Sequence, residues 1–323
     1  MMPALLAPDT AALSCPPAQP VHAWMPASPC GPTCVDAAAE AGALRVAARV
    51  LGIVGTLVSF PLAHYATPRR HRPAVQRRYA RMLLGSCGIR VRIIDNRGPD
   101  DRSGGVLVAA RHIGWTDIVA LTAVEPMAFV ARADMVEWPM LGDIAKRVRV
   151  IPIEREKLRT LPAVIESMAR RLTAGEHITF FPEGTTWCGR AHGRLRPALF
   201  QAAVDAETPV QPIRLRYVDR HGELSTVPGF VGVDSLGDSI RRVLHARGVT
   251  AEITLQPLEA PGTDRHDLAR RCEAAMADNE AVTRAFTDVI HGTENVEAIG
   301  TGAVRRATTT PQAAATENAH ALA

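Results

Sequence analysis

The sequence predicts an α/β fold preceded by an N-terminal membrane-associated helical element. Two observations support this prediction. From about Gly88 to residue 290, segments with strand patterns alternate with segments of helical periodicity, which is typical of layered α/β structures. Ahead of this region lies a run of uncharged, mostly apolar residues that is bordered by arginines.

Composition excludes several classes of protein. The chain has 323 residues, of which 47% are hydrophobic and 22% are charged, so it is neither fibrous nor wholly unfolded. A net charge of +4 is too small to indicate a nucleic-acid partner, and we expect none. The six cysteines do not form the dense framework of a small secreted scaffold, which favours a reducing compartment.

We divide the chain into four parts. Residues 1–41 are rich in Pro and Ala, lack Lys and Arg, and predict a flexible lead. Residues 42–79 predict a membrane-associated helix with a basic juxtamembrane segment. Residues 80–290 predict one folded domain, and residues 291–323, rich in Thr, Ala and Gly, predict a flexible tail.

Residues 50–66, VLGIVGTLVSFPLAHYA, form the membrane element. Seventeen uncharged residues lie at the lower limit for crossing a bilayer, and Pro61 would kink a helix, so spanning and half-insertion both stay open. A buried core helix is the alternative. Basic residues concentrate after the run, so the positive-inside rule places the following domain on the cytoplasmic face of the cell membrane. At that face these basic residues would meet anionic headgroups. The basic residues are Arg69, Arg70, Arg72, Arg77, Arg78 and Arg81.

Five segments of the domain predict strands. Residues 89–95 alternate apolar and charged side chains, and residues 104–111 form a continuous apolar run of the kind that is buried on both faces. The other predicted strands cover residues 177–181, 209–217 and 250–258.

Three further segments predict helices. Residues 158–172 place apolar side chains at steps of three and four, and Gly175 ends the pattern. Asp238 is interpreted as the cap of a short helix that runs to Arg247. A longer helix is expected over residues 266–290, with Leu268, Cys272, Met276 and Phe286 facing inward.

His112 and Asp117 are the candidate catalytic pair. They flank a turn that contains Gly114, between a buried strand and a helical pattern. Five residues on one helix would separate the two side chains, but across a strand-to-helix turn they can meet. A carboxylate that holds one tautomer makes an imidazole a usable base near neutral pH. No Gly-x-Ser-x-Gly elbow is present, so we expect the substrate to supply the nucleophile.

Three other segments give the pair a context. They are FVARADMVEWPMLGDIAKRVRVIPIER (129–155), FFPEGTT (180–186) and TPVQPIRLRY (208–217). With the His-x4-Asp pattern, their order and spacing resemble the lysophospholipid acyltransferase family over roughly residues 48–260. This family includes 1-acylglycerol-3-phosphate and lyso-ornithine lipid acyltransferases.

The resemblance implies a single glycerolipid-acyltransferase-like domain with a mixed sheet flanked by helices. It also implies that His112 deprotonates the free hydroxyl of a lysolipid while Asp117 orients the imidazole. The alkoxide then attacks an acyl thioester of coenzyme A or acyl carrier protein, without an acyl-enzyme intermediate. The partners are thus a membrane lipid acceptor, the acyl donor and the membrane surface, with no cofactor beyond the co-substrate.

The resemblance also assigns residues that bind the acceptor. Arg155 and the Glu183-Gly184-Thr185 turn match the motifs that hold its phosphate and glycerol, and Arg132 is a candidate second phosphate contact. A guanidinium pairs with two phosphate oxygens, and a Gly turn can present N–H groups to an anion. Glu183 is expected to bond a hydroxyl, because two anions would repel each other.

The sequence departs from the family pattern before and after His112. Arg111 stands where many members have Asn, and Gly114 stands where they have Ser. A guanidinium beside the base could bind an anionic head group, so the departures bear on acceptor identity more than on reaction type. The dipeptide Trp138-Pro139 is reminiscent of the lyso-ornithine branch.

We expect no metal site from the sequence. The spacing of Cys30 and Cys34 resembles a redox or metal pair, but no second pair accompanies it, so we interpret it as chance. His177, Cys188 and His192 match no familiar zinc-ligand spacing. Trp187, Cys188 and His192 are interpreted as loop-packing residues rather than pocket lining.

The leading functional hypothesis is an O-acyltransferase of phospholipid biosynthesis that converts 1-acylglycerol-3-phosphate to phosphatidic acid. A lyso-ornithine lipid O-acyltransferase is one alternative. A thioester or lipid hydrolase that uses the same His-Asp pair to activate water is another. A non-catalytic lipid-binding protein of the same fold is the third.

Overall fold

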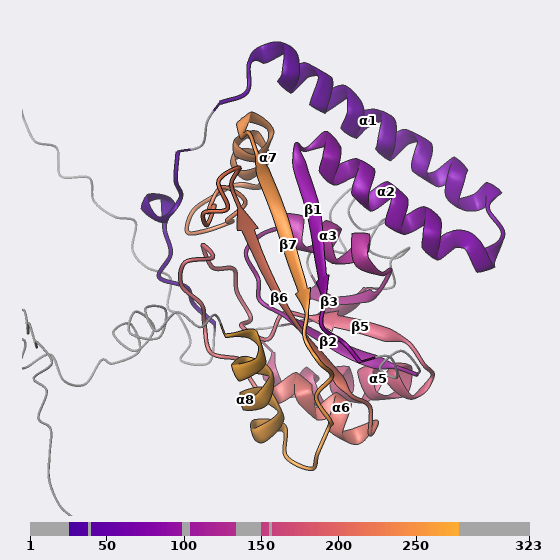
Figure 1. Ribbon diagram of the computed structural model, residues 1–323. Helices are drawn as coiled ribbons and strands as arrows, with labels where there is room; N and C mark the ends of the chain where they lie inside the picture. The colour runs from indigo at the N-terminus through magenta and orange to yellow at the C-terminus, as the bar shows by residue number, and fades with distance from the viewer. Residues whose placement is uncertain (1–25, 38–39, 99–103, 134–149, 155–156, 278–323) are drawn as a thin grey trace, which may run out of the picture.

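The computed structural model describes residues 26–37, 40–98, 104–133, 150–154 and 157–277 (Figure 1). Its centre is a seven-stranded sheet in the order β1-β7-β6-β2-β5-β3-β4. β6 and β7 are antiparallel, and the other neighbouring strands are parallel. The predicted α/β fold with a mixed sheet is thereby confirmed. The strands are β1 (Ile89–Asp95), β2 (Val106–Ala110), β3 (Ala128–Arg132), β4 (Ile151–Ile153), β5 (His177–Phe180), β6 (Val210–Val218) and β7 (Val249–Leu255).

Helices flank the sheet (Figure 1). Both faces of the sheet need cover, as β2 shows: all five of its side chains are buried, and they alternate between two apolar clusters. Val108 packs in the cluster that α2, α3 and α7 join, whereas Leu107 packs in the cluster of α5, α6 and α8. The α-helices are α1 (Ala43–Ala66), α2 (Arg72–Ser86), α3 (Thr116–Val124), α5 (Leu161–Thr173), α6 (Gln201–Asp205), α7 (Leu236–His245) and α8 (Arg265–Met276); the 3₁₀ turns are η1 (Pro32–Cys34), η2 (Arg69–His71), η4 (Leu158–Thr160) and η5 (Ala198–Phe200).

The predicted helices are present, with two differences. The stripe over residues 158–172 buries Met168 and Leu172, but Leu158 lies in η4 and is half exposed. α7 begins from Ser235 rather than Asp238. The two residues form a capping box, in which each side chain accepts a hydrogen bond from the other's backbone N–H. Ser235 is the N-cap and Asp238 is the N3 residue, so the predicted cap was wrong. Of the helix expected over residues 266–290, the structure describes the part up to Met276.

α1 is long and apolar enough to cross a membrane by length and composition. Its most apolar stretch of 18 residues has a mean hydropathy of 1.8, and only 6% of that stretch is buried. One face packs against α2, as the Phe60 and Tyr79 rings 5.3 Å apart show, and the two helices lie side by side in Figure 1. Pro61 is accommodated without ending the helix. The exposure of α1 contradicts the alternative of a buried core helix and indicates membrane association. Its large exposed apolar residues are Leu44, Val50, Leu51, Val54, Leu57, Val58, Leu62 and Tyr65.

Residues 26–37 differ from the flexible lead predicted over residues 1–41. The backbone N–H of Asp36 donates to Thr226 Oγ1 at 2.7 Å, and the Arg190 guanidinium bonds both Asp36 carboxylate oxygens. Composition could not reveal these contacts, because both partners lie far along the chain. Residues 1–25 and 278–323 lie outside the described part.

Candidate active site

The predicted site residues that the structure describes lie at one edge of the sheet. β2, β5, β3 and β4 are neighbours and run parallel, so their carboxyl ends meet at this edge. His112 follows β2, the Glu183-Gly184-Thr185 turn follows β5, and the exposed Arg132 ends β3. Ligands of α/β sheets bind at such an edge. Arg155, Trp138 and Pro139 lie outside the described residues.

His112 and Asp117 meet across the turn between β2 and α3. Nδ1 of His112 lies 2.9 Å from Oδ2 of Asp117, and the turn is closed by the Asp117 N–H bond to the Gly114 carbonyl. A carboxylate only accepts hydrogen bonds, so we assign the imidazole proton to Nδ1. Nε2 is then left with a lone pair.

Asp117 is held from every side. Its carboxyl is fully buried, and Oδ2 also accepts the backbone N–H groups of Ile113 at 2.6 Å and Gly114 at 2.9 Å. Oδ1 accepts the hydroxyl of Tyr217 at 2.8 Å. These donors balance the buried negative charge, so the carboxylate has one orientation in which to hold His112.

Tyr217 and Phe181 were missed by the sequence reasoning. Burial, followed by the charge of Asp117, raises the pKa of Tyr217 well above its ordinary value, so its hydroxyl stays a donor. The ring of Phe181 stacks on the imidazole, with centroids 3.9 Å apart. Both residues lie in quoted segments, but only their position at the same sheet edge connects them with His112.

Glu183 is placed differently from the expectation that it contacts the acceptor. Its side chain has no exposed surface. Oε2 accepts the backbone N–H of His112 at 2.8 Å, and Oε1 accepts the N–H of Gly193 at 3.0 Å and the Arg111 guanidinium at 3.2 Å. The carboxyl therefore ties the turn after β5 to the turn that carries His112.

Burial governs the ionisation of this cluster. It raises the pKa of Glu183 to about 7, although Arg111 and the two backbone donors partly oppose the shift. Burial and the nearby Arg111 charge lower the pKa of His192 to about 3, so this imidazole is neutral. Nδ1 of His192 lies 4.0 Å from Oε1 of Glu183.

The two departures from the family pattern have structural explanations. Arg111 is buried and directed to Glu183, so it does not face a head group. Gly114 packs against the loop after β6, where an added Cβ would lie 2.3 Å from the Pro228 carbonyl oxygen. The N–H of Phe230 also bonds the Ile113 carbonyl at 2.8 Å. A serine at position 114 would therefore clash with backbone.

Gly184 closes the turn after β5. Its φ of +75° favours glycine, and its N–H bonds the Phe181 carbonyl at 3.0 Å rather than pointing outward. An added Cβ would lie 2.8 Å from Pro26, so the N-terminal segment covers this turn. Thr185 beside it is partly exposed.

The trio His177, Cys188 and His192, which the sequence analysis considered for zinc, is not brought together. His177 lies at the start of β5 and contacts Glu125 and the Gly104 carbonyl, whereas Cys188 and His192 lie beyond its other end. Trp187 and Cys188 are each 2% exposed, which confirms loop packing for these two.

The chain is similar to known acyltransferases. An acyltransferase family model matches residues 88–216. The lyso-ornithine lipid O-acyltransferase of Rhizobium meliloti is 32% identical over 252 residues, which cover 72% of this chain and 80% of the relative. The chain belongs to the lysophospholipid acyltransferase family.

Two further similarities concern another relative and the fold. A 1-acyl-sn-glycerol-3-phosphate acyltransferase of Neisseria gonorrhoeae is 30% identical over 56% of this chain and 71% of its own length. The crystal structure of the acyltransferase PlsC from Thermotoga maritima has the same fold, with a TM-score of 0.51 at 13% identity, over 78% of this chain and 98% of that one. An acyl donor and a lipid acceptor follow from the family.

Proposed function

We propose that this acyltransferase transfers an acyl group from acyl-CoA or acyl carrier protein to the free hydroxyl of a lyso-ornithine lipid. The relative from Rhizobium meliloti supports this acceptor, because the similarity extends over 72% of the chain. The relative from Neisseria gonorrhoeae, named for the phosphate acceptor, is similar over 56%. The preference of the sequence analysis for 1-acylglycerol-3-phosphate is thus reversed, and that lipid becomes the second candidate.

The contact between His112 and Asp117 carries the proposed mechanism. Nε2 of His112 takes the proton of the acceptor hydroxyl as its oxygen attacks the thioester carbonyl. The tetrahedral intermediate collapses, the C–S bond breaks, and the leaving thiolate takes the proton back from the imidazolium. Asp117 stabilises the imidazolium in between.

Glu183 acts in this proposal as a positioning residue. It bonds the backbone of His112 and has no exposed surface, so it fixes the base and does not touch the acceptor. Arg132 and Arg155 remain the candidate contacts for the head group, which carries a carboxylate in an ornithine lipid and a phosphate in the second candidate. Thr185 remains a candidate acceptor contact at the same edge.

The role of Arg155 has a direct test. Replacement by Ala should raise the Michaelis constant of the acceptor much more than that of the thioester, because a guanidinium pairs with anionic oxygens of the head group. Arg159→Ala, four residues further on, is the control. Equal effects of Arg155→Ala on both Michaelis constants would contradict the assignment.

A lysolipid panel tests the acceptor. The purified protein would receive one acyl-CoA with lyso-ornithine lipid, lysophosphatidic acid or another lysolipid, and mass spectrometry would identify the product. We expect the highest kcat/KM with lyso-ornithine lipid, and a higher value with lysophosphatidic acid would establish the second candidate instead. Release of thiol that does not rise when any lysolipid is added would indicate a hydrolase.

We also propose that α1 holds the enzyme at the cell membrane with the catalytic domain on the cytoplasmic face. The exposed apolar side of α1 and the arginines that follow it support this orientation. The same arrangement would bring His112 close to a lipid acceptor.

A further inference from the structure

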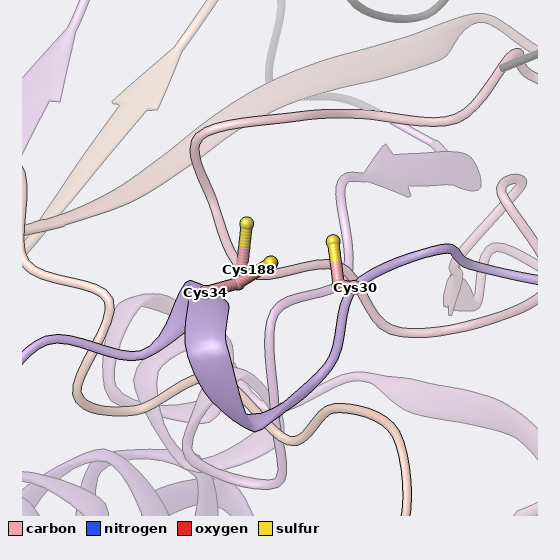
Figure 2. A group of neighbouring side chains, drawn as sticks. All are labelled: Cys30, Cys34 and Cys188. Carbon is pink, nitrogen blue, oxygen red and sulfur yellow. The ribbon is translucent and has the colours of Figure 1, made fainter.

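Three cysteines from distant parts of the chain meet beside the candidate active site. Cys30 precedes the η1 turn and Cys34 ends it, while Cys188 lies in the loop after β5. Their sulfur atoms all lie within 4.8 Å of one another. Figure 2 shows the three side chains gathered where the N-terminal segment passes this loop.

The cluster is enclosed but accessible. Cys30 and Cys188 are 4% and 2% exposed, whereas Cys34 is partly exposed. All three are free thiols. Trp187, Ala191 and Val231 pack with the cysteines in a small apolar cluster of their own. The sulfur atoms therefore lie in a low-dielectric site, and Cys34 is the most exposed of the three residues.

Backbone donors surround the sulfur atoms. The N–H groups of Arg190 and Ala191 donate to the sulfur of Cys188, and the N–H of Cys188 donates to the sulfur of Cys30. Such bonds favour a thiolate over a thiol, and they orient and tune sulfur ligands in metal centres.

An ion pair lies beside the cluster. The Arg190 guanidinium donates to both carboxylate oxygens of Asp36. Three thiolates with a divalent ion carry a net charge of −1, and the Arg190–Asp36 pair adds no net charge to it.

We propose that Cys30, Cys34 and Cys188 bind one thiophilic divalent metal ion of the Zn²⁺ class. Sulfur ligands about 2.3 Å from a tetrahedral zinc lie about 3.8 Å apart, a spacing that these side chains reach by small rotations. Each thiol releases its proton to solvent on binding. Thiolate ligands select soft ions over Mg²⁺ or Ca²⁺.

The ion would fasten the N-terminal segment across the candidate active site. Residues 26–37 already contact the turn of Gly184 through Pro26, and the N–H of Trp187, next to Cys188, bonds the His112 carbonyl at 2.8 Å. A metal ion bound by Cys188 and the two N-terminal cysteines would therefore link this segment to the backbone of His112. Its role here is structural and separate from the proposed acyl transfer.

Metal titration of the full-length protein in detergent tests the proposal. The protein would be reduced, stripped with a chelator and titrated with Zn²⁺ against a colorimetric chelator, and Co²⁺ would report sulfur ligation by its charge-transfer absorbance. We expect one Zn²⁺ per chain, with affinity at least about a hundredfold weaker in Cys188→Ala and Cys34→Ala. Cys272→Ala, which removes a buried thiol of α8 outside the cluster, is the matched control and should bind like the wild type.

Hydrogen exchange supplies a second measurement that does not depend on catalysis. Zn²⁺ should slow amide exchange in residues 26–37 of the wild type and of Cys272→Ala, and not in Cys188→Ala. Circular dichroism would verify that each variant is folded. Binding by the wild type no tighter than by Cys188→Ala would overturn the proposal, as would a disulfide between two of the three cysteines that persists under reducing conditions.

Discussion

The Asp117 carboxylate has four hydrogen-bond donors around it, and this arrangement gives His112 its single orientation. Two of the donors are backbone N–H groups of the turn that follows His112 itself. The base and its orienting group are thus built from one short segment, and the Tyr217 hydroxyl completes it from β6. The hydrogen bonds that orient the base are thus present in the structure without a substrate.

Removal of the imidazole is the first prediction at this scale. His112→Ala should lower kcat by about two to four orders of magnitude, the usual contribution of general-base catalysis. The protein should stay folded, because the ring is partly exposed and Asp117 keeps its other donors. His266→Ala, on the exposed side of α8, is the control, and steady-state kinetics with circular dichroism are the measurements. A loss of less than about tenfold would argue against the base and revive a non-catalytic lipid-binding protein.

The ionisation of Glu183 makes a second prediction, on stability. The folded-state pKa of about 7 lies above the ordinary value, so the folded protein binds this proton more tightly than the unfolded chain. The stabilisation is therefore full below about pH 4.5 and is lost as the pH rises to about 7. Glu183→Gln has no such proton, so its Tm relative to the wild type should rise across this interval and level off above it.

Thermal unfolding of both proteins between about pH 5 and pH 8 measures this difference. Glu166→Gln, at an exposed position of α5, is the control for the loss of a carboxyl group. Glu183→Gln should also lower kcat, because its amide turns a donor toward the N–H of His112 or Gly193. A Tm difference that does not change with pH would contradict the assigned ionisation.

At the scale of elements, the turn after β2 is closed by the loop after β6. Gly114 contacts this loop so closely that no side chain fits between them. Gly114→Ala should therefore destabilise the fold by about 1 to 3 kcal/mol, the usual cost of overpacking. It should lower kcat as well, because the Gly114 N–H bonds Asp117. Gly85→Ala on α2, where an added Cβ meets open space, is the control and should leave Tm unchanged or raised.

Denaturant unfolding and steady-state kinetics of the two glycine variants test this element. If Gly114→Ala is as stable and active as Gly85→Ala, the loop after β6 does not close on the turn. If Gly114→Ala lowers stability but leaves kcat unchanged, the turn can be displaced without moving Asp117.

At the scale of the whole molecule, α1 presents one face to α2 and an apolar face outward. Charges on the outward face should weaken membrane binding, since each costs about 3 kcal/mol in the bilayer interior. Leu51→Glu with Val58→Glu, at two positions that are 73% exposed, should move the protein from vesicle pellet to supernatant in co-sedimentation. Leu158→Glu, at an exposed apolar residue of η4, should sediment like the wild type. Equal sedimentation of all three proteins would mean that α1 is not the membrane element.

The α/β class, the five predicted strands and the His112–Asp117 pair could be predicted from local patterns in the chain, because periodicity and turn chemistry act over a few neighbouring residues. It also identified the family, through motifs that are continuous in the chain. Three contacts became visible only in the folded chain: Glu183 supports the backbone of His112, Tyr217 bonds Asp117, and Cys188 lies beside Cys30 and Cys34. Each of these depends on a partner from a distant segment, and the sheet order and the path of the N-terminal segment determine which distant segments meet.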